Sequence, residues 1–154
     1  MFLFVTRKRL AAIICALIFI IALIFALPHI INPAEAASGK VKAETNEERV
    51  AFLEGLGLTV ENEPAEIQEV RLPEKFSDVY EQYNRLQISC GFDLKPYAGR
   101  TVTRYAYKVT DWPGEGGPVY AEMLVYKGHI IGGDIHSLEL GGFMYGLKPR
   151  ARAA

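Results

Sequence analysis

Two histidines and one aspartate lie near the carboxyl end of this 154-residue chain, close enough in sequence to bind one metal ion. They are His129, Asp134 and His136, the last two within the segment IIGGDIHS. Two imidazoles and one carboxylate suit zinc or iron. Asp134 and His136 are two residues apart, so they point to the same face of a regular strand. His129 is seven residues from His136 and joins them only if the glycine pair 132–133 forms a bulge.

The same segment has an architectural interpretation, which we favour. Glycine lacks a Cβ, so a glycine pair bends a strand and allows another backbone or ring to approach closely. On this interpretation Asp134 and His136 are exposed and bind no metal. Replacing Gly132 or Gly133 with valine is then expected to destabilise the domain by about 1–3 kcal/mol.

The motifs of common enzyme classes are absent from the sequence. There is no G-x-S-x-G and no H-E-x-x-H, and the GEGG segment lacks the Lys-Ser or Lys-Thr of a phosphate-binding loop. Cys15 lies in an apolar run, and Cys90, next to a glycine, is expected to be a small buried residue. We therefore predict a protein that is not an enzyme, with no catalytic residue and no cofactor.

Aromatic residues form the candidate partner-binding surface. Trp112 lies in the loop DWPGEGGP, where strand formation does not require a large aromatic side chain. Tyrosine and tryptophan are favoured at binding surfaces because they join an apolar body to a polar tip. The candidate residues are Trp112, Tyr105, Tyr107 and Tyr120. The alternative for Trp112 is that it covers the edge of the core.

The amino-terminal region predicts a membrane anchor. Residues 10–27 carry no polar or charged side chain, and 18 helical residues span about 27 Å, close to the roughly 30 Å hydrocarbon core. Basic residues at 7–9 precede the run, so the amino terminus is expected in the cytoplasm and the remainder outside. We predict a cytoplasmic stub at 1–9 and a transmembrane anchor at 10–31. A small-residue pattern leaves cleavage near Ala36 as the alternative.

One domain is predicted beyond the anchor. Residues 32–43 are typical of a linker, 44–147 of a folded domain, and 148–154 of a disordered basic tail. Residues 44–147 contain 17 acidic and 9 basic side chains, a net charge of −8. Nucleic-acid binding requires clustered lysine and arginine, so this charge argues against it.

Periodicity predicts an α+β domain with about two helices packed on an antiparallel sheet of about five strands. Thr45 and Glu48 fit a capping box for a helix that ends near residues 55–57. A second helix is expected within 74–91, with an apolar stripe that we interpret as core. The stripe consists of Phe76, Val79, Tyr80, Tyr83 and Leu86. The predicted strands cover residues 58–62, 65–72, 100–110, 119–128 and 129–137, and a tight turn at Lys127-Gly128 joins the last two.

Four segments in combination resemble a known family: RVAFLEGLGLTV, FSDVYEQYNRLQISCGFDLKPYAGRTVTRYAYKV, VYKGHIIGGDIHS and GGFMYGL. They are similar to the bacterial domain of unknown function family 4830, over about residues 47–147. The resemblance implies a short membrane-anchored protein of Gram-positive bacteria with a compact α+β domain outside the membrane. It implies no activity and no functional residues. A turn followed by IIGGD also resembles the terminal hairpin of PepSY-type modules, which implies a protease-regulating domain.

The sequence therefore favours a membrane-anchored extracytoplasmic module that binds another membrane or envelope protein. The alternatives are a PepSY-like inhibitor or regulator of an exported protease and, third, a metal-dependent hydrolase. A pocket that joins titratable residues would favour the enzyme. An exposed sheet edge or aromatic patch would favour binding.

Overall fold

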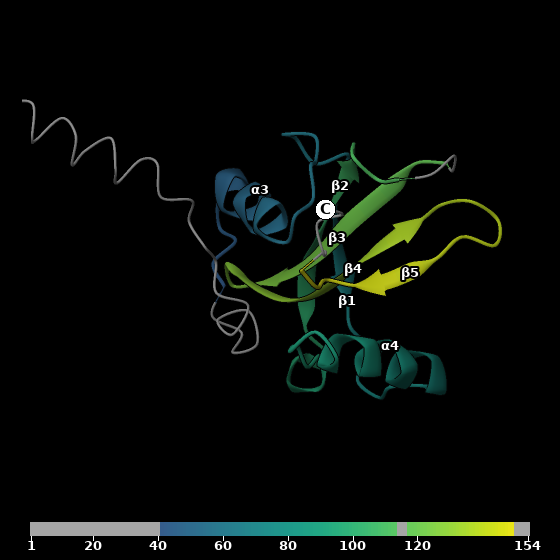
Figure 1. The fold of residues 1–154 in the computed structure, drawn as a ribbon. Helices are drawn as coiled ribbons and strands as arrows, with labels where there is room; N and C mark the ends of the chain where they lie inside the picture. Colours follow the sequence, from purple (N-terminus) through teal and green to yellow (C-terminus); the bar gives the residue numbers. More distant parts are fainter. Residues whose placement is uncertain (1–40, 114–116, 150–154) are drawn as a thin grey trace, which may run out of the picture. The chain divides into compact units, whose positions relative to one another are not determined.

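The computed structural model describes residues 41–113 and 117–149 (Figure 1). This part of the chain forms two principal helices and a five-stranded antiparallel sheet, which confirms the predicted α+β domain. Within the described ranges, no helix has both the length and the apolar composition needed to cross a bilayer. The predicted stub and anchor, residues 1–31, lie outside those ranges.

The first helix, α3 (Asn46–Gly55), begins at the predicted capping box. The backbone N–H of Glu48 donates to Thr45 Oγ1 at 3.2 Å, and the Thr45 N–H donates to Glu48 Oε2 at 3.2 Å. These bonds satisfy two N–H groups that the helix start would leave unpaired. Phe52 and Leu53 follow on the buried side of the helix.

The sheet has the strand order β1-β2-β3-β4-β5, so each strand pairs with the next one along the chain (Figure 1). The predicted strand at 58–62 is reduced to a single bridge between Val60 and Val109. The fifth strand instead follows β4, which is therefore not the edge of the sheet. The strands are β1 (Glu66–Arg71), β2 (Thr101–Val109), β3 (Val119–Tyr126), β4 (His129–Ser137) and β5 (Met144–Gly146).

Residues just before α3 also belong to the packed domain. The Ala43 N–H donates to the carbonyl of Gly128 at 2.8 Å, and Lys42 forms a bridge with His129. Val41 and Ala43 are both buried. The domain therefore includes the end of the segment 32–43, which the sequence predicts to be linker.

Two cores lie on opposite faces of the sheet, one beneath α3 and one beneath α4 (Asp78–Ile88) (Figure 1). Alternation along the central strands assigns side chains to one core or the other. The α3 core contains Phe52, Leu53, Tyr107, Ala121, Met123, Ile130 and Ile135. The α4 core contains Leu72, Leu94, Val102, Leu124 and Ile131.

A bulge in β4 changes which face its side chains occupy. Val125 pairs with Ile130, but the neighbouring Leu124 pairs with Gly132, so Ile131 is an extra residue in β4. Ile130 and Ile131 pack in opposite cores, as consecutive strand residues do, but Gly132 then faces the same α4 core as Ile131. Every residue after the bulge therefore lies on the face opposite to the one it would have in a regular strand. The bulge that the sequence suggests at the glycine pair is thus present, with Ile131 as its extra residue.

The glycine pair allows close packing on both sides of β4. A Cβ on Gly133 would overlap the backbone carbonyl oxygen of Glu122 and lie 2.6 Å from Leu147 Cδ1. A Cβ on Gly132 would lie 2.9 Å from Gln87 Oε1. The same Gln87 oxygen accepts a hydrogen bond from the Gly133 N–H at 2.8 Å, so α4 is tied directly to the bulged strand.

Candidate functional site

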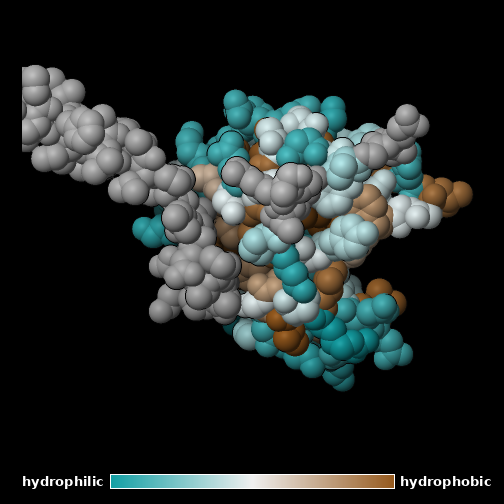
Figure 2. All heavy atoms as spheres, in the orientation of Figure 1, coloured by the Kyte–Doolittle hydropathy of each residue, from teal (hydrophilic) through white to brown (hydrophobic). Residues whose placement is uncertain are grey.

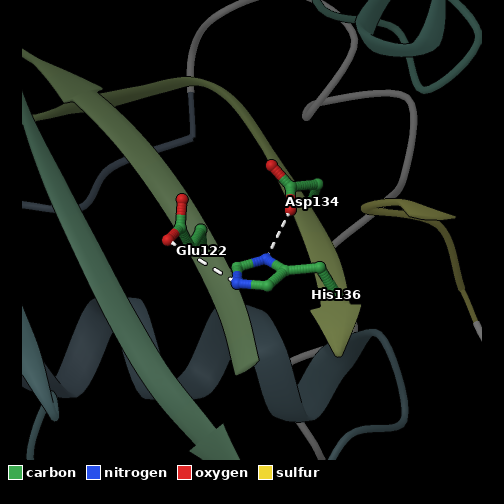
Figure 3. Close-up of side chains that lie close together, drawn as sticks. All are labelled: Glu122, Asp134 and His136. Carbon is green, nitrogen blue, oxygen red and sulfur yellow. Dashed lines mark hydrogen bonds and ion pairs between the residues drawn. The ribbon is translucent and has the colours of Figure 1, made fainter. Parts of the chain in front are cut away.

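Three titratable side chains converge on the α4 face of the sheet (Figure 3). Glu122 on β3 stands directly opposite Asp134 on β4, and His136 follows two residues later. The His136 ring lies between the two carboxylates. Its Nδ1 is 2.8 Å from Asp134 Oδ1, and its Nε2 is 3.9 Å from Glu122 Oε1 (Figure 3). One potential ligand atom from each residue lies within 4.8 Å of the other two.

The cluster is shielded from solvent and its charges are compensated. Asp134 is 2% exposed, and like charges directly opposite each other in a sheet are unfavourable without partners. The Tyr83 hydroxyl on α4 donates to Asp134 Oδ2 at 2.7 Å. On the other side, Arg104 Nη1 donates to Glu122 Oε1 at 3.0 Å, while its Nη2 is 2.8 Å from Glu66 Oε1. Polar contacts therefore run from β1 across the sheet to α4.

The surroundings shift the protonation of three of these groups. The hydrogen bond to Asp134 raises the pKa of His136, and the charges of Asp134 and Glu122 add to the rise, while burial and Arg104 oppose it. Burial and the Asp134 charge raise the pKa of Glu122, opposed by Arg104 and His136. Burial, the Asp134 charge and the hydrogen bond raise the pKa of Tyr83 far above its usual range, so its hydroxyl remains a donor.

A groove of about 860 Å³ opens between α4 and the sheet, and two members of the cluster, Glu122 and Asp134, form part of its floor. Arg104, Glu122 and Asp134 line it from below, together with Tyr83 from α4. The space-filling view shows apolar groups among polar ones around α4, as well as at the tip of the β4–β5 hairpin (Figure 2). Apolar lining residues of the groove are Val70, Leu72, Val79, Tyr80, Leu86, Leu124 and Met144.

A family model described as Domain of unknown function (DUF4830) matches residues 52–135. The chain belongs to this family. The matched range of the DUF4830 domain includes Tyr83, Glu122 and Asp134, and it ends one residue before His136. No curated protein and no solved structure matches the chain.

Two of the three candidate metal ligands, Asp134 and His136, lie together on β4. Asp134 and His136 share a face as predicted, but Asp134 is buried rather than exposed. His129 stands opposite Tyr126 at the far end of β4, roughly 20 Å away at about 3.3 Å per residue. The bulge brings it to the correct face without bringing it near the cluster. Its Nδ1 contacts the Lys127 carbonyl oxygen at 2.9 Å instead.

Glu122 takes the place in the cluster that the sequence assigned to His129. The signal for it was a single acidic residue inside the otherwise apolar and aromatic strand VYAEMLVY. The strand register that places Glu122 opposite Asp134 depends on the bulge and the hairpin turn. Neither can be located to the residue from the sequence, so the partner of Asp134 was missed.

The candidate partner-binding tyrosines do not share one surface. Tyr107 is fully buried, where Arg49 Nε donates to its hydroxyl at 2.9 Å, so it is not accessible to a partner. Tyr105 lies beneath the Arg49 guanidinium, 3.9 Å from the ring centroid, on the same face. Tyr120 lies on the opposite face and stacks on His136 at 6.3 Å between ring centroids.

Trp112 is half-buried at the edge of the α3 core. Its ring stacks on Phe143 at 5.1 Å and on Tyr145 at 6.3 Å between centroids. These contacts connect the loop after β2 with the segment around β5. The placement agrees with the alternative in which Trp112 covers the edge of the core.

The apolar stripe of α4 packs only in part. Val79 is 74% exposed, and Tyr80 and Tyr83 are half-buried. The fully buried positions on this helix are polar: Asn84, which accepts from the Leu94 N–H, and Gln87. Four of the five stripe residues, all except Phe76, therefore form one wall of the groove.

Proposed function

We propose that the chain is a membrane-anchored extracytoplasmic binding module whose groove takes an apolar segment of a membrane or envelope protein. The groove between α4 and the sheet is the observation that carries the proposal. Its volume of about 860 Å³ lies within the range of about 300–1,000 Å³ common for ligand sites. Apolar walls over a few convergent polar groups are the usual composition of such sites.

The exposed apolar residues at the groove supply a driving force for binding. Val79 on α4 is 74% exposed and Met144 on β5 is 52% exposed, and both line the groove. Covering apolar surface is favourable by roughly 25 cal/mol per Å². Two carboxylates, Glu122 and Asp134, and two guanidiniums, Arg85 and Arg104, line the groove, so their formal charges balance. A segment with an apolar body and a few polar groups is therefore the best match.

The membrane location rests on the amino-terminal sequence. The apolar run at 10–27 and the basic residues at 7–9 support an anchor with the domain outside the cell. Protease added to intact cells is expected to digest residues 40–147 and to leave cytoplasmic proteins whole. Survival of the domain until the cells are lysed would contradict this orientation.

Site-specific photo-crosslinking in intact cells tests the groove. A photoreactive amino acid at Val79 is expected to give a defined adduct with one membrane or envelope protein. Ile88 is the matched control, because it lies on the same helix and is 55% exposed but does not line the groove. Leu86→Glu, which places a charge in the groove wall, is expected to remove the adduct formed at Val79.

Two results would contradict the proposal. One is an adduct of equal yield at Val79 and Ile88, which would indicate non-specific contact. The other is an adduct at Val79 that persists unchanged when Leu86 carries the charge. The crosslinking at Val79 and at Ile88 is carried out with a metal chelator present, so that bound metal ions do not affect the yield.

A further inference from the structure

Glu122, Asp134 and His136 form the only cluster, within the described residues, in which three potential metal-binding side chains reach one point. The cluster differs from an ordinary solvated acidic surface. The side chains of Glu122 and His136 are 14% and 15% exposed, and that of Asp134 is 3% exposed. All three are held on two directly paired strands, so their backbones cannot move apart independently.

We propose that this cluster binds one divalent first-row transition metal ion, with His136 and Glu122 as ligands and Asp134 as the carboxylate that orients the imidazole. Imidazole and carboxylate together are ligands for zinc and iron. The inference goes beyond the proposed function: Glu122 and Asp134 also line the groove, but the ion is expected to bind when no protein segment fills it.

The spacing of the two ligand atoms suits an ion. His136 Nε2 and Glu122 Oε1 are 3.9 Å apart. Zinc binds nitrogen and oxygen ligands at about 2.0–2.2 Å, which puts two ligands of a tetrahedral ion roughly 3.3–3.5 Å apart. The two atoms therefore need to approach each other by only about 0.5 Å, which rotation of the Glu122 side chain provides.

The partners around the ligands match those of metal-binding histidines. A ligating histidine usually donates its second ring N–H to a carboxylate, which fixes its tautomer and orientation. Asp134 Oδ1 is 2.8 Å from His136 Nδ1, leaving Nε2 directed toward Glu122. Asp134 is held in turn by the Tyr83 hydroxyl at 2.7 Å. In space, the Asp134 carboxylate, the His136 imidazole and the proposed ion position therefore follow one another in that order.

Arg104 is the group that opposes a cation here. Its Nη1 donates to the same oxygen, Glu122 Oε1, at 3.0 Å. Its other nitrogen keeps an ion pair with Glu66 at 2.8 Å, so Arg104 retains a partner when Glu122 turns toward an ion. The positive charge nonetheless weakens binding, and its removal should strengthen it. General damage to the fold would weaken metal binding, not strengthen it. Tighter binding after removal of the Arg104 charge is therefore a specific test of the site.

The experiment is a titration of the full chain with Zn²⁺ by calorimetry, using untagged protein in a non-ionic detergent. One equivalent is expected to bind. His136→Gln is expected to weaken binding by at least about 100-fold, because even the loss of an outer partner costs about 10–100-fold. His129→Gln is the matched control, since it removes a histidine from the same strand outside the cluster. Arg104→Gln is expected to bind Zn²⁺ at least tenfold more tightly.

A second variant is used if the first one does not fold. If His136→Gln fails to fold, Glu122→Gln, which keeps the size of the side chain, takes its place with the same expectation. Absence of stoichiometric binding to the wild-type chain would overturn the proposal. Binding that is unchanged in a folded His136→Gln or Glu122→Gln chain would also overturn it, as would unchanged or weaker binding by Arg104→Gln. The titration requires no partner protein, so its outcome is separate from that of the crosslinking experiment.

Discussion

Replacing Gly133 with alanine should destabilise the domain by about 3 kcal/mol. The new Cβ would overlap the Glu122 carbonyl oxygen and lie 2.6 Å from Leu147 Cδ1. The carbonyl belongs to the paired strand β3, so relief of the overlap requires the two strands to separate. Overpacking of this kind costs about 1–3 kcal/mol, and weakening the bond from Gly133 N–H to Gln87 adds about 1 kcal/mol.

Gly132→Ala is the matched comparison and should cost only about 1 kcal/mol. Its Cβ would lie 2.9 Å from Gln87 Oε1 and 3.0 Å from Leu94 Cδ2. Both atoms are ends of side chains, which move more easily than a paired backbone. The two neighbouring substitutions add the same methyl group. The difference between their unfolding free energies therefore measures how much more rigid the paired β3 backbone is than the side chains of Gln87 and Leu94.

Thermal unfolding followed by the fluorescence of Trp112, the only tryptophan in the chain, provides the assay. For a domain of about 100 residues, 1 kcal/mol corresponds to roughly 4–8 °C in Tm. Gly133→Ala should therefore lower Tm by more than about 10 °C, and Gly132→Ala by roughly half that or less. Equal shifts, or a larger shift for Gly132→Ala, would refute the reasoning from strand packing.

Three further predictions concern other contacts. In the presence of EDTA, His136→Gln should lower the free energy of unfolding more at about pH 6 than at about pH 9. The raised pKa of His136 stabilises the fold below its ordinary pKa, and that contribution is lost as the pH rises through the raised value. Equal losses in urea titrations at the two pH values would contradict this. Trp112→Ala should lower the free energy of unfolding by about 2 kcal/mol, measured in urea titrations followed by circular dichroism. This is less than the roughly 3–5 kcal/mol for a fully buried aromatic residue. A cost below about 0.5 kcal/mol would show that the stacking of Trp112 on Phe143 contributes little. Tyr107→Phe should lower the free energy of unfolding by about 1–3 kcal/mol in urea denaturation. The change leaves Arg49 Nε without its acceptor, and Arg49 is only 7% exposed. A neutral effect would indicate that water replaces the hydroxyl.

Local signals in the sequence were sufficient to locate most of the elements. Thr45 and Glu48 specify a helix start through two hydrogen bonds between neighbours, so the capping box needs no tertiary information. The turn at Lys127-Gly128 is equally local, since both residues have positive φ, 48° and 75°. β5 was missed because three residues are too few to show an alternating pattern, and its pairing with β4 is what defines it.

The candidate site was predictable only in part. Asp134 and His136 share a face because they are two residues apart on one strand, and that relation is local. Glu122 joins them through the register between β3 and β4, which one extra residue alters. The exposure of Val79 also depends on tertiary structure, because an apolar helical stripe has the same spacing whether it faces a closed core or an open groove.

The strand order β1 to β5 has a consequence for how rapidly the domain forms. Three of the four strand pairings join neighbours linked by a short connection, so little chain entropy is lost in closing each one. Only the pairing of β1 with β2 closes a long loop, which contains α4. Because α4 and this loop also carry the groove wall, we expect the hairpins to form first and the groove to be completed in the slowest step of folding.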